Sequence, residues 1–373
     1  MYTLKCGFIG LGLIGGSIAK ALKNQTAFQT FHTVYDPDLS SLELAVKEGV
    51  ADKIVTSLED KSICAFSDCD YLFLCAPVQY NIANLSQIRS AISPNCIITD
   101  VGSVKTGIHD AITELGLESQ FIGGHPMAGS ERIGYRNSKA LLLENAYYIL
   151  TPTPFVSTDK INAYQNLVKS MGALPLILSY EGHDYATAAI SHLPHIIAAA
   201  LVNLVKDSDS ADGIMKTIAA GGFKDITRIA SSSPEMWQQI CLSNTSNIAS
   251  LLGDYIHALD KIYEVLLSGD SAQIYDFFHS ARTYREGFVG TGNGPIKTEY
   301  TLNIDISDEP GALASIATML AARGISIKNI GITHNREYEE GALRIEFYTA
   351  EDVDSAKQLL ERKNYTVYTK QDS

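Results

Sequence analysis

Residues 5–22 read KCGFIGLGLIGGSIAKAL, and this stretch decides the fold of the first part of the chain. An apolar strand pattern leads directly into Gly10, Gly12 and Gly15, and a helical pattern follows them. The G-x-G-x-x-G spacing between a strand and a helix is typical of dinucleotide-binding folds. Gly10 makes the tight turn, Gly12 lets a pyrophosphate approach the backbone, and Gly15 allows close packing of helix on strand. The helix N-terminus then faces the phosphates.

A second predicted strand, Thr30 to Tyr35, ends in Asp36. An acidic residue about 20 positions after the glycines accepts hydrogen bonds from the adenosine ribose hydroxyls and repels a 2′-phosphate. We therefore expect NAD rather than NADP as the cofactor. The residues expected to contact it are Gly10, Gly12, Leu13, Ile14, Gly15, Asp36, Ala76, Pro77 and Ser103.

Strand and helix patterns alternate over about 175 residues, which predicts an open parallel sheet with helices on both faces. We interpret residues 1–180 as an α/β, doubly wound domain of the Rossmann type. The further strands are expected at Asp70–Cys75, Cys96–Thr99, Phe121–Gly123, Ala146–Leu150 and Leu174–Leu178.

His125 lies in the loop 122–131, IGGHPMAGSE, between Gly124 and Pro126. A titratable imidazole on a stiff loop at the carboxyl edge of such a sheet is placed where ligands bind. Ser103 follows the neighbouring strand, so we expect its hydroxyl to orient the His125 imidazole. Two structural alternatives stay open: His125 bonded to backbone, and Ser103 as the N-cap of the next helix.

Residues 181–290 are expected to form an all-helical domain that binds substrate and dimerises. His183 to Lys206 has the pattern of one long helix with Pro194 inside it, flanked by His192 and His195. These histidines have no carboxylate or thiolate at a suitable spacing, so we expect no metal. Lys224, Arg228 and Trp237 follow on further helices.

A broad apolar face lies on the next predicted helix, Ser243 to Ser268, and is wider than one small bundle needs. It predicts either a homodimer interface or simple core. Its residues are Leu251, Leu252, Tyr255, Ile256, Leu259, Ile262, Tyr263, Leu266 and Leu267.

A glycine-rich linker is expected at Gly287–Lys297, before a last module at 298–373. Its pattern predicts the order βαββαβ, a ferredoxin-like arrangement. It carries no candidate catalytic residue, which favours a sensing role.

Composition narrows the functional classes. The chain has 373 residues, of which 46% are apolar, and a net charge of −13. This charge argues against nucleic acid or an anionic membrane as the main partner, so an anionic substrate needs a local cluster of cations. The six cysteines show no metal-binding spacing and suggest reduced thiols. With no signal peptide and no membrane span expected, we predict a cytoplasmic protein.

Taken together, the motifs resemble the prephenate dehydrogenase family, in its form with a C-terminal ACT domain. The motifs that carry the resemblance are GFIGLGLIGGS, DVGSVK, GGHPMAGSE, SHLPH, GGFKDITRIA with MWQQI, and ISDEPGAL. Their order spans essentially the whole chain and is far more specific than any one of them.

The resemblance implies NAD-dependent oxidative decarboxylation of prephenate to 4-hydroxyphenylpyruvate in tyrosine biosynthesis. It implies that His125 takes the proton of the ring hydroxyl, that Ser103 orients His125, and that Arg228 pairs with a prephenate carboxylate. The remaining substrate-binding residues implied are Ser191, His192, His195, Gly221, Lys224 and Trp237.

The resemblance also implies an effector site at the first turn of the ACT domain, with L-tyrosine as the expected feedback inhibitor. Backbone N–H groups at the helix start suit its carboxylate. The residues expected there are Asp308, Glu309, Pro310, Gly311 and Ala312.

Three other functions were weighed. An arogenate dehydrogenase has the same chemistry on an amino side chain, and the sequence leaves this choice open. A 3-hydroxyacid dehydrogenase should carry a lysine where His192 and His195 stand. A non-catalytic sensor of NAD and amino acids is disfavoured by the intact Ser103, His125 and Arg228.

Overall fold

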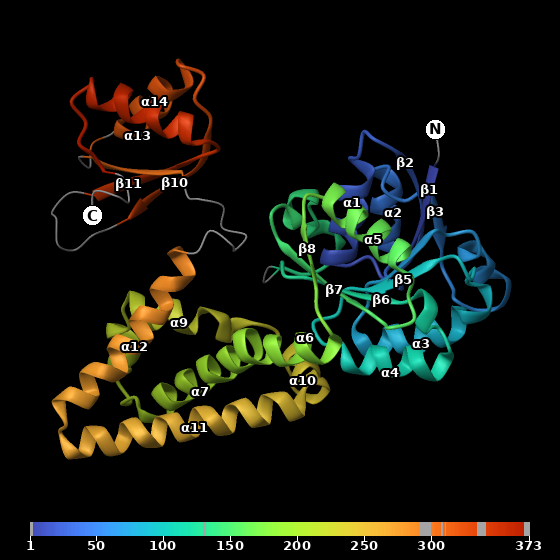
Figure 1. Cartoon of the computed structure of the whole chain (residues 1–373), viewed down its shortest axis with the longest axis horizontal. Coiled ribbons are helices and arrows are strands. Elements are labelled where there is room, and N and C mark those ends of the chain that lie inside the picture. The colour runs from blue at the N-terminus through green and yellow to red at the C-terminus, as the bar shows by residue number, and fades with distance from the viewer. Residues whose placement is uncertain are drawn as a thin grey trace. The chain divides into compact units, whose positions relative to one another are not determined.

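The computed structural model describes residues 3–129, 132–290, 300–306, 309, 311–333 and 341–368 (Figure 1). The chain divides into two compact units, Met1–Ile274 and Tyr275–Ser373. The first unit contains both the nucleotide-binding fold and most of the helices expected for the middle domain. The expected boundaries near residues 180 and 290 remain predictions.

Parallel strands in the order β3-β2-β1-β4-β5 form the base of the first unit. They are β1 (Thr3–Ile9), β2 (Gln29–Tyr35), β3 (Lys53–Val55), β4 (Tyr71–Leu74) and β5 (Ile97–Asp100). A parallel bridge between Ile98 and Phe121 joins β5 to a three-stranded sheet. Its strands are β6 (Ile122–Pro126), β7 (Tyr147–Pro152) and β8 (Leu174–Ile177). The order 3-2-1-4-5-6 is that of the dinucleotide-binding fold, as predicted.

The expectation of a fully parallel sheet is wrong for its last two strands. β7 pairs antiparallel with β6, and β8 runs parallel to β7. The cause lies in the connection after Pro126, whose described residues form only the short 3-10 turns η4 (Tyr135–Asn137) and η5 (Ala140–Leu143). A parallel return needs a helical crossover over the sheet face. The link from β7 to β8 has one, α5 (Thr158–Ser170).

Two apolar layers cover the faces of the sheet. Phe8 and Phe73 stack at 5.0 Å in one layer, while Ile9 and Leu74 belong to the other. This alternation follows from the period of two in a strand. The covering helices and short turns are α1 (Leu13–Lys23), α2 (Leu39–Lys47), α3 (Val78–Ile88), α4 (Thr106–Leu115), η1 (Asp60–Phe66), η2 (Arg89–Ala91) and η3 (Glu118–Gln120).

The long helix expected from His183 to Lys206 is interrupted. It consists of α6 (Tyr180–Thr187), a π-helical turn η6 (Ala188–His192) and α7 (Leu193–Ser208). Pro194 has no N–H to donate, and in a regular α-helix its ring would clash with the carbonyl of the residue four positions earlier. The π turn shifts the register just before it, so that Pro194 stands in the first turn of α7.

This helical run, Tyr180–Ser208, is long and apolar enough to cross a membrane by length and composition alone. The sequence expectation was that the chain holds no such segment. The core helix of a protein meets the same two criteria. In this run, His183, Asp184 and His192 are buried, and the Asp184 carboxylate bonds the start of α4.

The remaining helices follow this run. They are α8 (Ile214–Ile218), α9 (Gly221–Thr227), η7 (Arg228–Ser231), α10 (Pro234–Ser243), α11 (Thr245–Ser268) and α12 (Ser271–Gly290). Since α12 continues to Gly290, the linker expected from Gly287 is wrong at its start. Residues 291–297 of that linker lie outside the described residues.

The C-terminal module has the predicted order βαββαβ. Its elements are β9 (Thr301–Ile306), α13 (Ala312–Ala321), β10 (Ile327–Thr333), β11 (Gly341–Phe347), α14 (Ala350–Glu361) and β12 (Val367–Tyr368). The strands pair antiparallel in the order β10-β11-β9-β12. Ile316 and Leu360 from the two helices pack on this sheet in a core of its own.

The first prediction concerns the glycine turn. Gly10 has φ +95, and a Cβ there would lie 2.8 Å from the backbone N of Ala76. Gly49 has φ +70, but a Cβ there meets no atom within 4 Å. We expect Gly49→Ala to cost about 1–2 kcal/mol from backbone strain alone. Gly10→Ala should cost about 1–3 kcal/mol more, because two backbones must separate. Urea unfolding compares the two, and equal losses would contradict the close contact.

Candidate active site

The glycine loop is built to receive a phosphate group. The Gly10 N–H donates to the Tyr35 carbonyl at 2.8 Å, and a Cβ on Gly15 would lie 2.8 Å from the Cys75 Cβ, so α1 packs tightly against the end of β4. Gly12 caps α1, and a Cβ there meets nothing within 4 Å. The open side of the loop is thus at Gly12, where the first N–H groups of α1 are available to an anion. The residues present fit a dinucleotide.

Asp36 and Ala76 lie on either side of this loop. Asp36 Oδ2 accepts from the Leu11 N–H at 2.6 Å, and Oδ1 accepts from the Asp38 N–H at 2.8 Å. The Asn81 side chain holds Ala76 by accepting from its N–H at 3.0 Å and donating to its carbonyl at 2.7 Å. Three segments distant in the sequence therefore meet at the carboxyl edge, as expected.

A buried ion pair joins the end of β5 to β6. Lys105 Nζ contacts Asp100 Oδ2 and donates to the Gly124 carbonyl at 2.6 Å, and both charged side chains are fully buried. Asp100 Oδ1 also accepts from the Gly124 N–H at 3.1 Å. Burial lowers the pKa of Lys105, and the Asp100 carboxylate opposes this shift. The pair fixes the backbone immediately before His125.

His125 makes its ring contact with a residue that the sequence did not suggest. Its Nδ1 lies 2.8 Å from Nε2 of His183, and His183 Nδ1 lies 2.8 Å from Oδ1 of Asp184. The two rings meet edge to face, with centroids 5.1 Å apart. The three side chains form a continuous chain of hydrogen bonds from β6 to α6.

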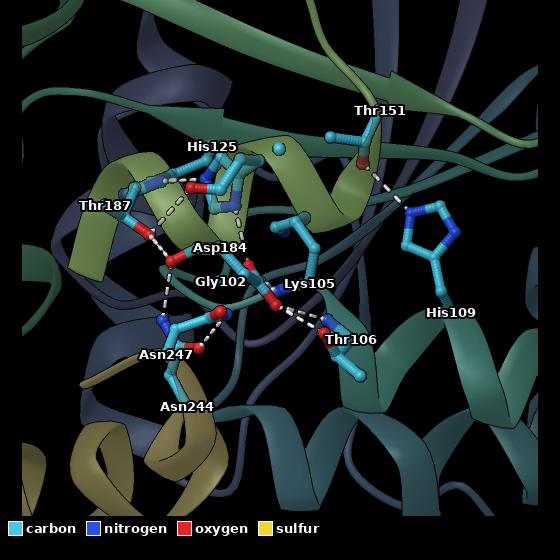
Figure 2. Close-up of polar contacts among 12 residues, drawn as sticks. Gly102, Lys105, Thr106, His109, His125, Thr151, Asp184, Thr187, Asn244 and Asn247 are labelled. Atoms are coloured by element: carbon cyan, nitrogen blue, oxygen red, sulfur yellow. Dashed lines mark hydrogen bonds and ion pairs between the residues drawn. The ribbon is translucent and has the colours of Figure 1, made fainter. Parts of the chain in front are cut away.

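The Asp184 carboxylate lies at the N-terminus of α4 (Figure 2). Oδ1 accepts from the Lys105 N–H at 2.7 Å, and Oδ2 accepts from the N–H and the hydroxyl of Thr106 at 2.8 and 2.6 Å. Burial alone would raise the pKa of Asp184, yet hydrogen bonds from His183 and Thr106 hold it below its usual value. The carboxylate is therefore an ionised, acceptor-only group.

Ser103 stands on the loop after β5, next to the strand of His125, as expected. Within the described part of the chain, no hydrogen bond joins it to His125. The N-cap alternative is wrong, because α4 begins at Thr106 and its N-cap is Lys105. The carboxylate of Asp184 bonds that helix end instead. The proposed contact of Ser103 with cofactor and His125 remains a prediction.

Three residues of the expected substrate pocket are brought together. The His195 ring stacks on Trp237 at 3.7 Å, and His192 meets the same indole edge to face at 6.0 Å. His195 Nδ1 lies 2.9 Å from the Ser191 carbonyl, and His192 Nδ1 lies 3.2 Å from Nδ2 of Asn244. Among the described residues, the buried indole N–H of Trp237 has no acceptor.

The expected cations stand on exposed positions. Lys224 and Arg228 are exposed, as is Gly221 at the start of α9. Burial lowers the pKa of His195, and the Arg228 charge adds to this lowering, against the hydrogen bond of the ring with Ser191. Arg228 thus lies near enough to His195 for its charge to lower the pKa of that ring.

His125 and His192 are neutral imidazoles near neutral pH. Burial lowers the pKa of His125 well below 6.5, the charges of His183, Lys105 and His192 add to the shift, and Asp184 opposes it. Burial also lowers the pKa of His192 to about 4. A neutral imidazole is the form that accepts a proton.

Sequence reasoning missed Asp100, Lys105, His183, Asp184 and Asn244. Asp100 and Lys105 lie within the quoted motif DVGSVK. The adjacent pair His183–Asp184, directly after the last strand of the sheet, was a further signal.

A glycine loop with Asp36 beside it, and a neutral imidazole at the same sheet edge, define the class: an NAD-dependent dehydrogenase. The chain belongs to the prephenate dehydrogenase family. The family's nucleotide-binding domain matches residues 18–176 and its dimerization domain matches 179–280, and an ACT domain matches 300–364.

Individual relatives agree with this assignment. Prephenate dehydrogenase of Bacillus subtilis (strain 168) is 37% identical over 359 residues, which cover 95% of each chain. The crystal structure of prephenate dehydrogenase from A. aeolicus, in complex with hydroxyphenyl propionate and NAD+, has a TM-score of 0.71 at 30% identity. It covers 77% of this chain and 99% of that one. Synechocystis arogenate dehydrogenase has a TM-score of 0.69 at 28% identity, over 76% and 100% of the chains. The predicted family, fold class and NAD cofactor are confirmed.

Proposed function

We propose that the protein catalyses the NAD-dependent oxidative decarboxylation of prephenate to 4-hydroxyphenylpyruvate and CO2, in L-tyrosine biosynthesis. The observation that carries this proposal is the neutral, half-buried His125 at the sheet edge that also holds the glycine loop. Oxidation of a ring alcohol needs a base at its hydroxyl, and the family supplies the substrate class.

In this mechanism, His125 binds the ring hydroxyl and accepts its proton as carbonyl character develops at that carbon. NAD+, when bound, supplies the hydride acceptor. The ring carboxylate leaves as CO2, and its bonding electrons complete the aromatic ring. That second half needs little assistance because aromatisation drives it, and Ser103 is proposed to orient the reacting groups.

The substrate is a dianion in a protein of net charge −13, so its carboxylates need cations placed locally. We assign Arg228 to one carboxylate, since its planar guanidinium suits a bidentate pair, and Lys224 beside it. The unpaired indole N–H of Trp237 supplies a further donor. Ser191, His192, His195 and Gly221 complete the pocket in this proposal.

The related arogenate dehydrogenase activity is the second candidate, supported by the similarity to the Synechocystis enzyme. Steady-state rates with prephenate and arogenate distinguish the two.

We propose that Asp36 makes the enzyme prefer NAD+ over NADP+. A cytoplasmic location is also proposed, supported by six cysteines that are all free thiols.

The second prediction tests His125. His125→Asn should lower kcat for prephenate about 10²–10⁴-fold, with KM changed only a few fold, because general base catalysis is lost. In the wild type, the neutral base is lost only below the depressed pKa of His125. The acid limb of the kcat profile should therefore lie below pH 6.5. NADH absorbance measures both. A variant that keeps wild-type turnover would remove His125 from the mechanism.

The third prediction tests the substrate cation. Arg228→Ala should raise KM for prephenate by an amount equivalent to about 1.5–3 kcal/mol, since a charge-assisted contact is lost. Arg228→Lys keeps the positive charge but loses the planar guanidinium that binds a carboxylate through two hydrogen bonds. Its KM should lie between those of the wild type and Arg228→Ala. Lys216→Ala, on α8, is the control for charge alone. An unchanged KM in Arg228→Ala would assign Arg228 to structure.

The fourth prediction concerns assembly. The proposed homodimer is supported by the match to a dimerization domain and by exposed apolar residues along α11, among them Tyr263 and Leu267. Light scattering at micromolar concentration should give a dimer. Tyr263→Asp combined with Leu267→Asp should shift it toward monomer, while Lys261→Ala on the same helix should not. A monomeric wild type would refute the dimer.

The effector site is proposed at the start of α13. Asp308 and Pro310 lie outside the described residues. Gly311 caps α13 with φ +94, and a Cβ there meets nothing within 4 Å. Glu309 and Ala312 flank it. This open helix start supports binding of an amino-acid carboxylate, and we propose L-tyrosine as the feedback inhibitor.

The fifth prediction follows. L-tyrosine should inhibit prephenate oxidation by the full chain, and inhibition should disappear in a chain that ends near residue 294. The match to the A. aeolicus enzyme over 99% of its length indicates that a chain of that extent folds. The kcat without tyrosine serves as the control. Inhibition that persists without the module would place the tyrosine site in the catalytic unit.

A further inference from the structure

His125 is hydrogen-bonded to His183, and His183 to Asp184. Which atom donates in each of these bonds decides which ring nitrogen of His125 can act as the base. We propose that His183 and Asp184 are positioning residues that hold the proton of neutral His125 on Nδ1. The lone pair of Nε2 is then free to accept the substrate proton. The proposal deepens the proposed function and rests on it for the identity of the reaction.

The polarity follows from the Asp184 end of the chain. An ionised carboxylate only accepts, so Nδ1 of His183, at 2.8 Å, carries a hydrogen and donates to Oδ1. As part of this proposal, we assign His183 the neutral form, in which Nε2 then has only a lone pair. His125 Nδ1 lies 2.8 Å from this nitrogen, so it must donate, and Nε2 of neutral His125 is unprotonated.

Asp184 is held so that this polarity does not reverse. Its two oxygens accept from four donors: His183, the Lys105 N–H, and the N–H and hydroxyl of Thr106. The Lys105 and Thr106 donors are held in place by the start of α4, and the His183 donor is part of a rigid imidazole ring. A rotation of the carboxylate would leave buried N–H groups without partners, at a cost that exceeds the gain from any single new bond.

The same arrangement meets the charge that forms during the reaction. When the O–H proton of the substrate moves to Nε2, His125 becomes a cation, and its Nδ1–H still donates to His183. No second proton has to move. A protonated His183, Lys105 and a protonated His192 each oppose a positive charge on His125, while Asp184 is the carboxylate that favours it. His183 thus links the new cation to a fixed anion.

The direct test is the tautomer of His125 in the full chain. The chain has nine histidines, so long-range ¹H–¹⁵N spectra of protein labelled at histidine can be assigned, with His125→Asn identifying the His125 signals. We expect wild-type His125 to carry its proton on Nδ1 near neutral pH. A His125 protonated on Nε2 in the wild type would overturn the proposal, whatever the enzyme does with prephenate.

Variants of His183 then connect the tautomer to turnover. His183→Leu removes the acceptor, and it should lose the Nδ1–H preference and lower kcat by up to about 10⁴-fold, the scale for a wrong tautomer in a related arrangement. KM for prephenate should stay within a few fold. His183→Gln can accept from His125 and donate to Asp184, so it should restore the Nδ1–H tautomer and at least tenfold of the lost kcat.

The matched control is His109→Leu. His109 is also a buried imidazole, bonded to Thr151 at 3.0 Å and stacked on Tyr180 at 4.5 Å. This variant should lose packing but keep kcat within a few fold. Equal losses of kcat in both variants, or a His183→Leu enzyme with an unchanged tautomer and turnover, would assign His183 to packing. A wild type with the expected tautomer but no prephenate-dependent NADH would instead refute the proposed function.

Discussion

One buried carboxylate determines how the two halves of the first unit meet. Asp184 belongs to α6, yet it bonds the backbone at the start of α4 and the ring of His183, while its own carbonyl accepts from Asn244 at 2.8 Å. An unpaired buried charge is costly, so the donors to the carboxylate, from the start of α4 and from His183, must be present together. The helices that carry the histidines proposed to bind substrate are therefore fixed relative to the sheet edge that carries His125.

The charged groups of the site lie at two depths: one ion pair is buried, and two cations are exposed. Inside, the charge of Lys105 is matched by Asp100, and burial is the main cause that lowers the pKa of His125 and of His192, so both rings can accept protons. Arg228 and Lys224 are exposed, so their charges carry no desolvation cost of burial. A dianion can thus be attracted at the surface while its hydroxyl meets an uncharged base deeper in.

The sequence predicted the parts of the site that depend on local patterns. The glycine loop and Asp36 each follow a strand, and His125, expected in a loop, lies near the carboxyl end of β6; parallel strands bring such carboxyl ends together. The direction of β7 was missed because it depends on the absence of a crossover helix, not on the strand itself. The contact of His125 with His183 spans 58 residues and depends on how α6 docks, which no local pattern encodes.

The hydrogen bonds of His192 and His195, on either side of Pro194, determine which ring nitrogen of each histidine carries a hydrogen. A carbonyl only accepts, so His195 Nδ1, 2.9 Å from the Ser191 carbonyl, carries the hydrogen and leaves Nε2 as an acceptor. Asn244 donates through Nδ2, since its Oδ1 accepts from Asn247 at 2.8 Å. His192 Nδ1 therefore accepts, and its Nε2 carries the hydrogen. The two histidines beside Pro194 thus present opposite polarities next to the indole N–H of Trp237, which allows one pocket to recognise both donors and acceptors of a substrate.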